Sequence, residues 1–420
     1  MKKCLLALLL PFSALCLRAQ PSLEAFIAEN PDRAAGNLHV YERLDTTETP
    51  VPEGYAPFYV SHYGRHGSRY HSSLSFFEGS LGKLGKAHEA GILTTDGRQL
   101  MDVLQQLSDA HDEMKGILTQ VGARQQQEIA SRLSRKCPEV FHQADRPLIY
   151  AVSSTSERCI QSMANFCTVL KGDAPALDVE YHTGKRYMRY ICNPFDISYM
   201  HDRKHEICDS ILHEDFPYER LFQKTFTDPA KGRKILGSRY YFKTIFDALS
   251  IAQNLDEETL PLLRTYFTPE ELAACNRSDN ARYFATWCIS EEFGDTYVQG
   301  VGGPLLREMV GKADLAVAGN DHAADLRFGH DSGLTPLLAL MGVEGYEVRK
   351  EAEAGDSWPV AKYIPMGSNL QMMFYRNGEG HVLVKLLRNE AETTIPALGT
   401  VCGPYYDWET LRSWLLSRIK

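Results

Sequence analysis

Long hydrophobic runs, cysteine motifs and low-complexity tracts are scarce in this 420-residue sequence. No C-x-x-C pair occurs among its ten cysteines, which excludes zinc-ribbon and thioredoxin-like motifs. No segment beyond the N-terminus approaches the ~18 consecutive apolar residues that a membrane helix needs, so we expect no membrane span. Because no low-complexity tract occurs and aromatic residues make up 10% of the chain, collagen-like, coiled-coil and disordered classes are excluded.

Positive charge is also limited. The chain has 45 Lys and Arg residues against 54 Asp and Glu residues, which gives a formal net charge of −9. Such a chain lacks the broad basic surface that nucleic-acid binding requires, so no nucleic-acid partner is expected. With 44% hydrophobic and 24% charged residues, the composition is that of a globular protein large enough to bury a full core.

The N-terminus has the pattern of a secretory signal peptide. Two lysines precede an apolar run over residues 4–17, and cleavage is expected after Ala19. Removing residues 1–20 takes away three basic residues and no acidic one, which changes the formal charge from −9 to −12. The sequence therefore predicts an exported protein, either periplasmic or on the cell surface or secreted.

Cysteines outside this leader allow more than one interpretation. In an exported protein, Cys192 with Cys208, or Cys275 with Cys288, could form disulfides. Alternatively, several of the cysteines are buried, inert thiols. The sequence does not decide between these alternatives.

The chain begins and ends with a pattern of alternating strands and helices. Apolar strands are predicted at 56–62, 147–153, 324–330, 370–375 and 381–387, and helices at 96–114, 121–135, 155–170 and 334–341. Between them, residues 171–319 carry mainly helical signals, including a capping box that begins at Thr268. We therefore expect an α/β core from residues 21–170 and 320–420, with a mainly α-helical inserted domain at 171–319.

The residues that could bind a ligand or catalyse a reaction lie where the predicted strands end. The first strand leads into Arg65-His66-Gly67-Ser68-Arg69, in which two arginines bracket a histidine in a glycine turn. Guanidinium groups bind phosphate bidentately, and a neutral imidazole nitrogen can attack phosphorus. A surface turn that happens to hold these residues is the alternative for this motif taken alone.

Two further strand ends carry matching residues. Arg158 lies at the start of the helix after the second strand, and His330-Asp331 follows the third. Ligands of open α/β sheets gather at the carboxyl ends of strands, where helix N-termini also favour anions. We expect these residues to join the first motif in one site, with Asp331 able to protonate a leaving oxygen.

This ordered set resembles the histidine acid phosphatases, clade 2 of the histidine phosphatase superfamily, with their R-H-G-x-R and late H-D motifs. Residues 118–125 likewise resemble the family's L-T-x-x-G-x-x-Q helix start. The resemblance implies a phosphoglycerate-mutase-like α/β core with helices on both faces of the sheet and an inserted helical domain. It implies that His66 forms a phosphohistidine and Asp331 is the general acid. The phosphate would be bound by Arg65, Arg69, Arg158 and His330.

Within that family the sequence is most similar to the multiple inositol polyphosphate phosphatases, which act on phytate. The similar segments are residues 188–192, 301–305, 330–342 and 384–390. One departure is that Asp331 directly follows His330, whereas those enzymes have Glu two residues after the histidine. The resemblance implies a small-molecule phosphomonoester substrate, with no metal and no cofactor, and leaves the preferred substrate open.

Two basic or histidine-containing segments support weaker hypotheses. Lys185, Arg186 and Arg189 could bind further phosphates of a polyphosphorylated ligand, or could form a basic face at a domain junction. His201 and His205 have the i, i+4 spacing of metal ligands, but the charged residues between them favour a solvated loop.

Several other functions remain as alternatives. A general acid phosphatase or sugar phosphatase would use the same motifs. A phosphoglycerate-mutase-like phosphotransferase shares R-H-G, but the signal peptide and helical insertion argue against it. A non-catalytic phosphate-binding protein would need neither His66 nor Asp331, yet both are present.

Overall fold

The computed structural model describes residues 21–43, 47–142, 148–196, 198–237, 241–255, 262–319 and 322–420. Its centre is a mixed sheet in the order β3-β2-β4-β1-β5-β6-β7, with β8 pairing with β6. The strands are β1 (Tyr55–Arg65), β2 (Leu148–Ser153), β3 (Asp178–His182), β4 (His322–Gly329), β5 (Asn369–Asn377), β6 (Val382–Arg388), β7 (Ala391–Thr393) and β8 (Tyr405–Asp407). Strands β1, β2, β3 and β4 are parallel to their neighbours in this group, so their carboxyl ends share one edge.

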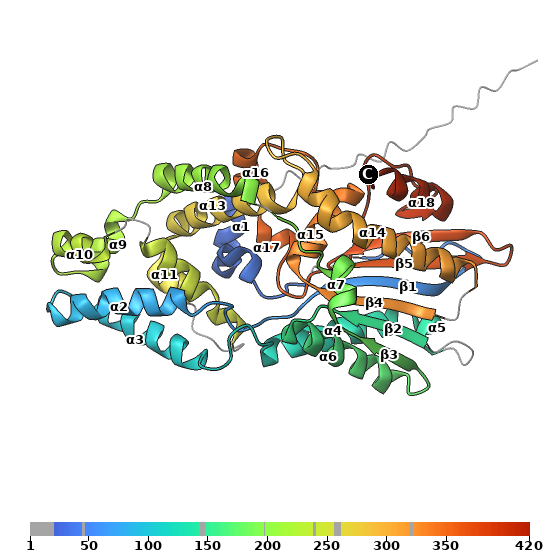
Figure 1. Cartoon of the computed structure of the whole chain (residues 1–420), viewed down its shortest axis with the longest axis horizontal. Coiled ribbons are helices and arrows are strands. Elements are labelled where there is room, and N and C mark those ends of the chain that lie inside the picture. Colours follow the sequence, from blue (N-terminus) through green and yellow to red (C-terminus); the bar gives the residue numbers. More distant parts are fainter. Residues whose placement is uncertain are drawn as a thin grey trace, which may run out of the picture.

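Both faces of the sheet are buried by helices (Figure 1). Successive residues of a strand point to opposite faces. Tyr59 and Tyr63 of β1 belong to the cluster under α14 (Thr296–Val317), α15 (Asp331–Met341) and α18 (Trp408–Ser417). Val60 belongs to the opposite cluster, with α4 (Gln120–Lys136), α5 (Pro138–Phe141) and α6 (Glu157–Asp173). The predicted α/β fold with helices on both faces is therefore confirmed.

A third buried cluster forms a helical lobe at the other end of the molecule (Figure 1). It contains α1 (Leu23–Glu29), the 3₁₀-helix η1 (Pro31–Leu38), α2 (Ser75–Glu89), α3 (Thr95–Ala110), α9 (Glu219–Thr225), α10 (Pro229–Leu236), α11 (Tyr241–Ser250), α12 (Leu262–Tyr266) and the first half of α13 (Pro269–Trp287). The predicted capping box of Thr268 and Glu271 begins α13. The second half of α13 packs over the sheet through Phe284.

Segments from the predicted core and from the predicted insertion pack together in both parts of the structure. Strand β3 belongs to the sheet although it lies in the range 171–319. Helices α2 and α3 come from the range 21–170, yet they pack in the helical lobe. The division of the chain into a core and an insertion stays a prediction, and the buried clusters show which segments share a hydrophobic interior.

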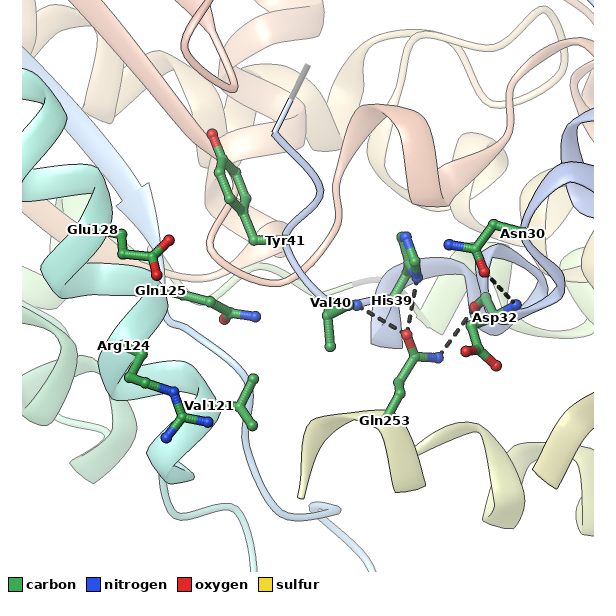
Figure 2. Close-up of a pocket in the computed structure, with 10 residues that line it drawn as sticks. All are labelled: Asn30, Asp32, His39, Val40, Tyr41, Val121, Arg124, Gln125, Glu128 and Gln253. Atoms are coloured by element: carbon green, nitrogen blue, oxygen red, sulfur yellow. Dashed lines mark hydrogen bonds between the residues drawn. The ribbon is translucent and has the colours of Figure 1, made fainter. Parts of the chain in front are cut away.

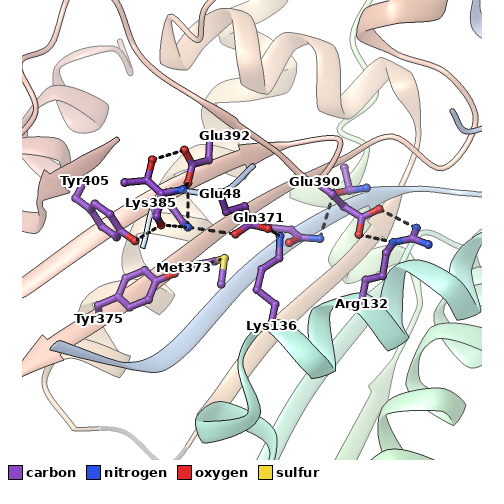
Figure 3. A network of polar contacts seen from close by, with 12 residues as sticks. Glu48, Arg132, Lys136, Gln371, Met373, Tyr375, Lys385, Glu390, Glu392 and Tyr405 are labelled. Atoms are coloured by element: carbon purple, nitrogen blue, oxygen red, sulfur yellow. Dashed lines mark hydrogen bonds and ion pairs between the residues drawn. The ribbon is translucent and has the colours of Figure 1, made fainter. Parts of the chain in front are cut away.

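A polar network fixes the segments before β1 to the sheet (Figure 3). The buried Lys385 of β6 contacts carboxylate oxygens of Glu48 at 3.2 Å and Glu392 at 3.1 Å. Arg132 of α4 donates two hydrogen bonds to Glu390, at 2.9 and 2.8 Å, and Glu390 also accepts one from the Tyr41 hydroxyl. Each buried charge thus has a partner of opposite sign, as burial of a charge requires.

Two further expectations concern thiols and membranes. Cys275 and Cys288 are separate, buried free thiols, so the disulfide considered between them is not formed. Cys192 is also a free thiol, and the side chain of Cys208 lies outside the described residues. Over the described ranges, no helix is both long enough and apolar enough to cross a membrane.

Candidate active site

The arginine–histidine motif lies where β1 ends at the parallel edge of the sheet. The backbone N–H of His66 donates to the Gly329 carbonyl at the end of β4, at 3.0 Å. Arg65 and His66 are only 1% and 2% exposed. The motif is therefore a buried turn between two strand ends, and the alternative of a surface turn is wrong.

Close packing of two glycines brings α4 against this turn. A Cβ atom on Gly67 would lie 2.4 Å from the Gly122 carbonyl oxygen, and one on Gly122 would lie 2.1 Å from the Ser68 carbonyl oxygen. Neither position has room for a side chain. Gln125 then accepts from the Ser68 N–H at 2.8 Å. The L-T-x-x-G-x-x-Q segment thus holds the turn that contains His66 in place.

Hydrogen bonding fixes the tautomer of His66. Its Nδ1 lies 2.9 Å from the Gly67 carbonyl oxygen, which can only accept, so Nδ1 carries the proton. Burial, followed by the positive charges of Arg65 and Arg158, holds the pKa of His66 well below its usual range. The imidazole is therefore neutral near neutral pH, and Nε2 has the lone pair that a nucleophile needs.

The ends of β2 and β4 bring the second histidine beside the first. The rings of His66 and His330 have centroids 5.5 Å apart. His330 Nδ1 lies 3.3 Å from Arg158 Nη2, and its Nε2 lies 3.0 Å from Ser154 Oγ. Since guanidinium can only donate, His330 Nδ1 accepts and Nε2 carries the proton. Burial, followed by the charge of Arg158, lowers the pKa of His330 to about 4.

Asp331 is the first residue of α15 and contacts two groups across the site. Its Oδ2 lies 3.3 Å from Arg65 Nη2 and accepts a hydrogen bond from Asn37 Nδ2 at 3.0 Å. Burial raises the pKa of Asp331, but the charge of Arg65 and the Asn37 hydrogen bond outweigh it and lower the pKa to about 2. Asp331 is therefore a carboxylate in the ligand-free protein.

Positive charge exceeds negative charge among these side chains. Burial, followed by the charges of Arg65 and Arg158, lowers the pKa of Arg69 to about 10 because the cations repel one another. Arg65, Arg69 and Arg158 each have a buried Nε with no hydrogen-bond partner among the described residues. A bound dianion would relieve this repulsion, so the arrangement has the electrostatics of a phosphate site.

The predicted basic cluster lies near this site without entering it. Lys185, Arg186 and Arg189 belong to α7 (Lys185–Ile191) and are exposed. The Tyr63 hydroxyl donates to the carbonyl of Ile191 at 2.8 Å, which ties the end of α7 to β1. The structure thus separates the buried arginines and histidines at the strand ends from an exposed basic helix beside them.

Three site residues were missed by the sequence analysis because they carry no motif. Asn37 lies in a polar stretch before β1. The Tyr63 hydroxyl accepts from the backbone N–H of His330 at 3.3 Å. Tyr283 of α13 is buried, and this burial together with the nearby negative charge of Asp331 raises its pKa to about 12. Each reaches the site through tertiary packing, for which the local sequence gives no signal.

A separate cavity of about 290 Å³ lies between α4 and the helical lobe (Figure 2). In Figure 2, Arg124, Gln125 and Glu128 of α4 face Asp32 and His39 across it. Its lining carries both positive and negative side chains, and it does not include Arg65, His66, Arg69, Arg158 or His330. Its polar lining does not make it the candidate site, because the arginines and histidines at the strand ends lie elsewhere.

The other histidine pair lies on a helix. His201 and His205 belong to α8 (His201–Asp215), so the expected solvated loop is wrong. Their rings are 4.5 Å apart. Within the described part of the chain, no group of three or more His, Cys, Asp or Glu side chains is arranged to hold a metal ion.

Solved structures of two proteins show the same overall fold. A multiple inositol polyphosphate phosphatase from Bifidobacterium longum in complex with phosphate has a TM-score of 0.77 and 19% identity, covering 92% of this chain and 98% of that one. A phytase from D. castellii has a TM-score of 0.70 and 15% identity, covering 92% and 85%. A search of curated protein sequences gave no significant match.

The family itself is shown by a sequence model rather than by these distant structures. The model of the histidine phosphatase superfamily (branch 2) matches residues 65–389. This range begins at the first arginine of the motif and includes all three strand ends described above. The chain therefore belongs to branch 2 of the histidine phosphatase superfamily and is a phosphoric monoester hydrolase.

Proposed function

We propose that this protein is an exported, metal-independent acid phosphatase that hydrolyses phosphomonoesters through a phosphohistidine at His66, with inositol polyphosphates such as phytate as substrates. The observation that carries the proposal is the neutral His66 imidazole, whose Nε2 lone pair is free within a group of arginines. A phosphate-binding protein would have no use for such a nucleophile. The export part rests on the N-terminal sequence, since residues 1–20 lie outside the described ones.

The reaction follows from the roles of these side chains. Arg65, Arg69, Arg158 and His330 bind the non-bridging phosphate oxygens and stabilise the charge that develops on them. His66 Nε2 attacks phosphorus, the bond to the ester oxygen breaks, and the protonated Asp331 gives its proton to that oxygen. Water then attacks the phosphohistidine with Asp331 as base, which releases inorganic phosphate and restores both residues.

The substrate class rests on what surrounds the buried site. The exposed Lys185, Arg186 and Arg189 of α7 could contact phosphates other than the reacting one. Among similar folds, the Bifidobacterium longum enzyme has also been crystallised with inositol hexasulfate, an analogue that carries six anionic groups. A general acid phosphatase or sugar phosphatase would have the same buried groups and would not depend on the α7 cations.

Activity is expected to persist in excess EDTA. In this mechanism, arginines and His330 stabilise the charge of the transferring phosphoryl group that a metal ion would otherwise stabilise. The measurement is release of inorganic phosphate from p-nitrophenyl phosphate before and after dialysis against the chelator. Loss of activity that zinc or magnesium restores would contradict the metal-independent mechanism.

Arginines inside and outside the buried site are expected to behave differently when replaced by alanine. Arg158→Ala should lower kcat on a monophosphate by roughly 10²–10³-fold, because it removes a donor to the reacting phosphate. Arg186→Ala, the matched exposed control, should change kcat on the same substrate by less than about threefold, as exposed charges contribute little. Equal losses would mean that the phosphate-binding residues are misassigned.

The α7 cations provide the test of the substrate class. Replacing Lys185, Arg186 and Arg189 together by alanine should raise KM for phytate about tenfold or more while leaving the monophosphate kinetics unchanged, since the lost contacts are to distant phosphates. An unchanged KM for phytate would favour the general acid phosphatase or sugar phosphatase over the inositol polyphosphate phosphatase.

A further inference from the structure

Asn37 reaches the site from a segment that carries no catalytic motif. Its Nδ2 donates to Asp331 Oδ2 at 3.0 Å, and its backbone carbonyl accepts from Arg65 Nη1 at 2.7 Å. The preceding Gly36 has φ 59° and ψ −120°, a conformation that side-chain-bearing residues rarely adopt, and this sharp turn directs the chain toward the site. One residue thus contacts both the carboxyl group and the arginine that pairs with it.

The backbone on either side of Asn37 is held by buried asparagines of the helical lobe. Asn276 Nδ2 donates to the Ala34 carbonyl at 2.8 Å, and Asn254 Nδ2 donates to the Leu38 carbonyl at 2.7 Å. Both asparagines are buried. Because these bonds lie on both sides of Asn37, its amide is held against Asp331 by the fold rather than by the contact itself.

We propose that Asn37 is a positioning residue that holds the Asp331 carboxyl group beside Arg65 and sets the pH range over which the protein hydrolyses alkyl phosphates. The inference rests on the proposed role of Asp331 as proton donor. It adds to that role a residue supplied by the segment before β1, which contacts Arg65 at the end of β1 and Asp331 after the end of β4.

Asp331 has several charged or titratable neighbours, and Asn37 acts in addition to them. Arg65 of β1 is the nearest cation, and Arg69 and His330 also favour the carboxylate. On the remaining sides lie the phenols of Tyr63 and Tyr283 and the thiols of Cys159 and Cys192, whose pKa values are raised mainly by burial and further by the negative charge of Asp331. After the charge of Arg65, the hydrogen bond from Asn37 is the main cause that lowers the pKa of Asp331.

The sign of the effect follows from which form of Asp331 acts. The proton donor must be protonated, so the rate falls as pH rises through the pKa of Asp331 in the substrate complex. Asn37→Ala removes a donor to the carboxylate and raises that pKa, so the alkaline limb of the kcat profile should move up by about one pH unit. Asn37→Asp, which is nearly isosteric, adds a like charge and should move it further.

The experiment compares kcat–pH profiles of wild type, Asn37→Ala and Asn37→Asp on glycerol phosphate, an alkyl ester, and on p-nitrophenyl phosphate. The matched control is Asn30→Ala, at the start of the same helix, whose side chain accepts from the Asp32 N–H and makes no contact with the site. We expect the alkaline limb to move up in the order wild type, Asn37→Ala, Asn37→Asp on glycerol phosphate only. A uniform loss of rate with an unmoved limb, or no change at all, would overturn the inference.

One further variant separates this outcome from failure of the proposed function. If Asp331→Asn leaves the activity ratio of the two substrates unchanged, Asp331 is not the proton donor and the proposed function is wrong in that respect. If the ratio changes while the Asn37 variants keep the wild-type limb, only the inference about Asn37 is wrong.

Discussion

Replacing His66 by alanine is expected to lower kcat by ~10⁴-fold or more on every phosphomonoester while leaving the fold intact. The substitution removes the imidazole that would form the covalent intermediate. The two histidines of the site are not equivalent, since His330 Nε2 donates to Ser154 and its Nδ1 accepts from Arg158. His330 therefore has no free lone pair with which to replace His66. The measurement is steady-state turnover of p-nitrophenyl phosphate, with circular dichroism to check folding.

His381→Ala is the matched control for this variant. His381 pairs with Asp407 at 3.0 Å and contacts Tyr55, the first residue of β1, at the end of that strand opposite the turn that contains His66. Its loss should leave turnover unchanged. Retention of more than about a hundredth of wild-type activity by a folded His66→Ala protein would mean that another group attacks phosphorus.

Asp331→Asn is expected to lower activity according to the leaving group. An alkoxide such as an inositol oxygen needs a proton as it departs, and general acid catalysis contributes about 10²–10⁴-fold. A nitrophenolate leaves as a stable anion and needs that proton much less. The activity ratio of p-nitrophenyl phosphate to phytate should therefore rise by about tenfold or more in the variant.

The same requirement sets the pH dependence of the wild-type protein. Asp331 has a pKa of about 2 in the ligand-free protein. A bound phosphate dianion partly neutralises the surrounding arginines and adds negative charge, which raises that pKa in the complex. Activity on alkyl phosphates should thus decline as pH rises and be highest on the acid side of neutrality. Equal slowing of both substrates in Asp331→Asn would instead show that Asp331 positions His330 or its turn.

The meeting of the candidate site residues at one edge of the sheet could be predicted because these residues follow strand ends. Arg65 and His66 follow β1, Arg158 lies in the first turn of α6, and His330 and Asp331 follow β4. Parallel strands share a carboxyl edge, so local motifs imply a common location. The structure brings these side chains together within hydrogen-bonding or ring-contact distances.

The parts of the fold and of the site that the sequence does not predict depend on contacts between segments that are far apart in the chain. Asn37 has no sequence signal, because its role arises from the packing of η1 between the helical lobe and α15. Strand β3 has little apolar character, since it lies at the sheet edge with exposed residues such as Tyr181, and edge position is not visible in its sequence. Helix α2 contains glycines at 79, 82 and 85, which weaken its helical signal, and tertiary packing through Phe77 and Leu84 overrides it.

Trapping the covalent intermediate tests the central claim most directly. Wild-type protein mixed with a ³²P-labelled phosphomonoester and quenched within milliseconds should carry label that survives base and is lost in acid, as a phosphohistidine requires. The label should be absent from His66→Ala and present in the His381→Ala control. An acid-stable adduct, or label retained by His66→Ala, would contradict the account, because the phosphoryl group would then be carried by a different residue.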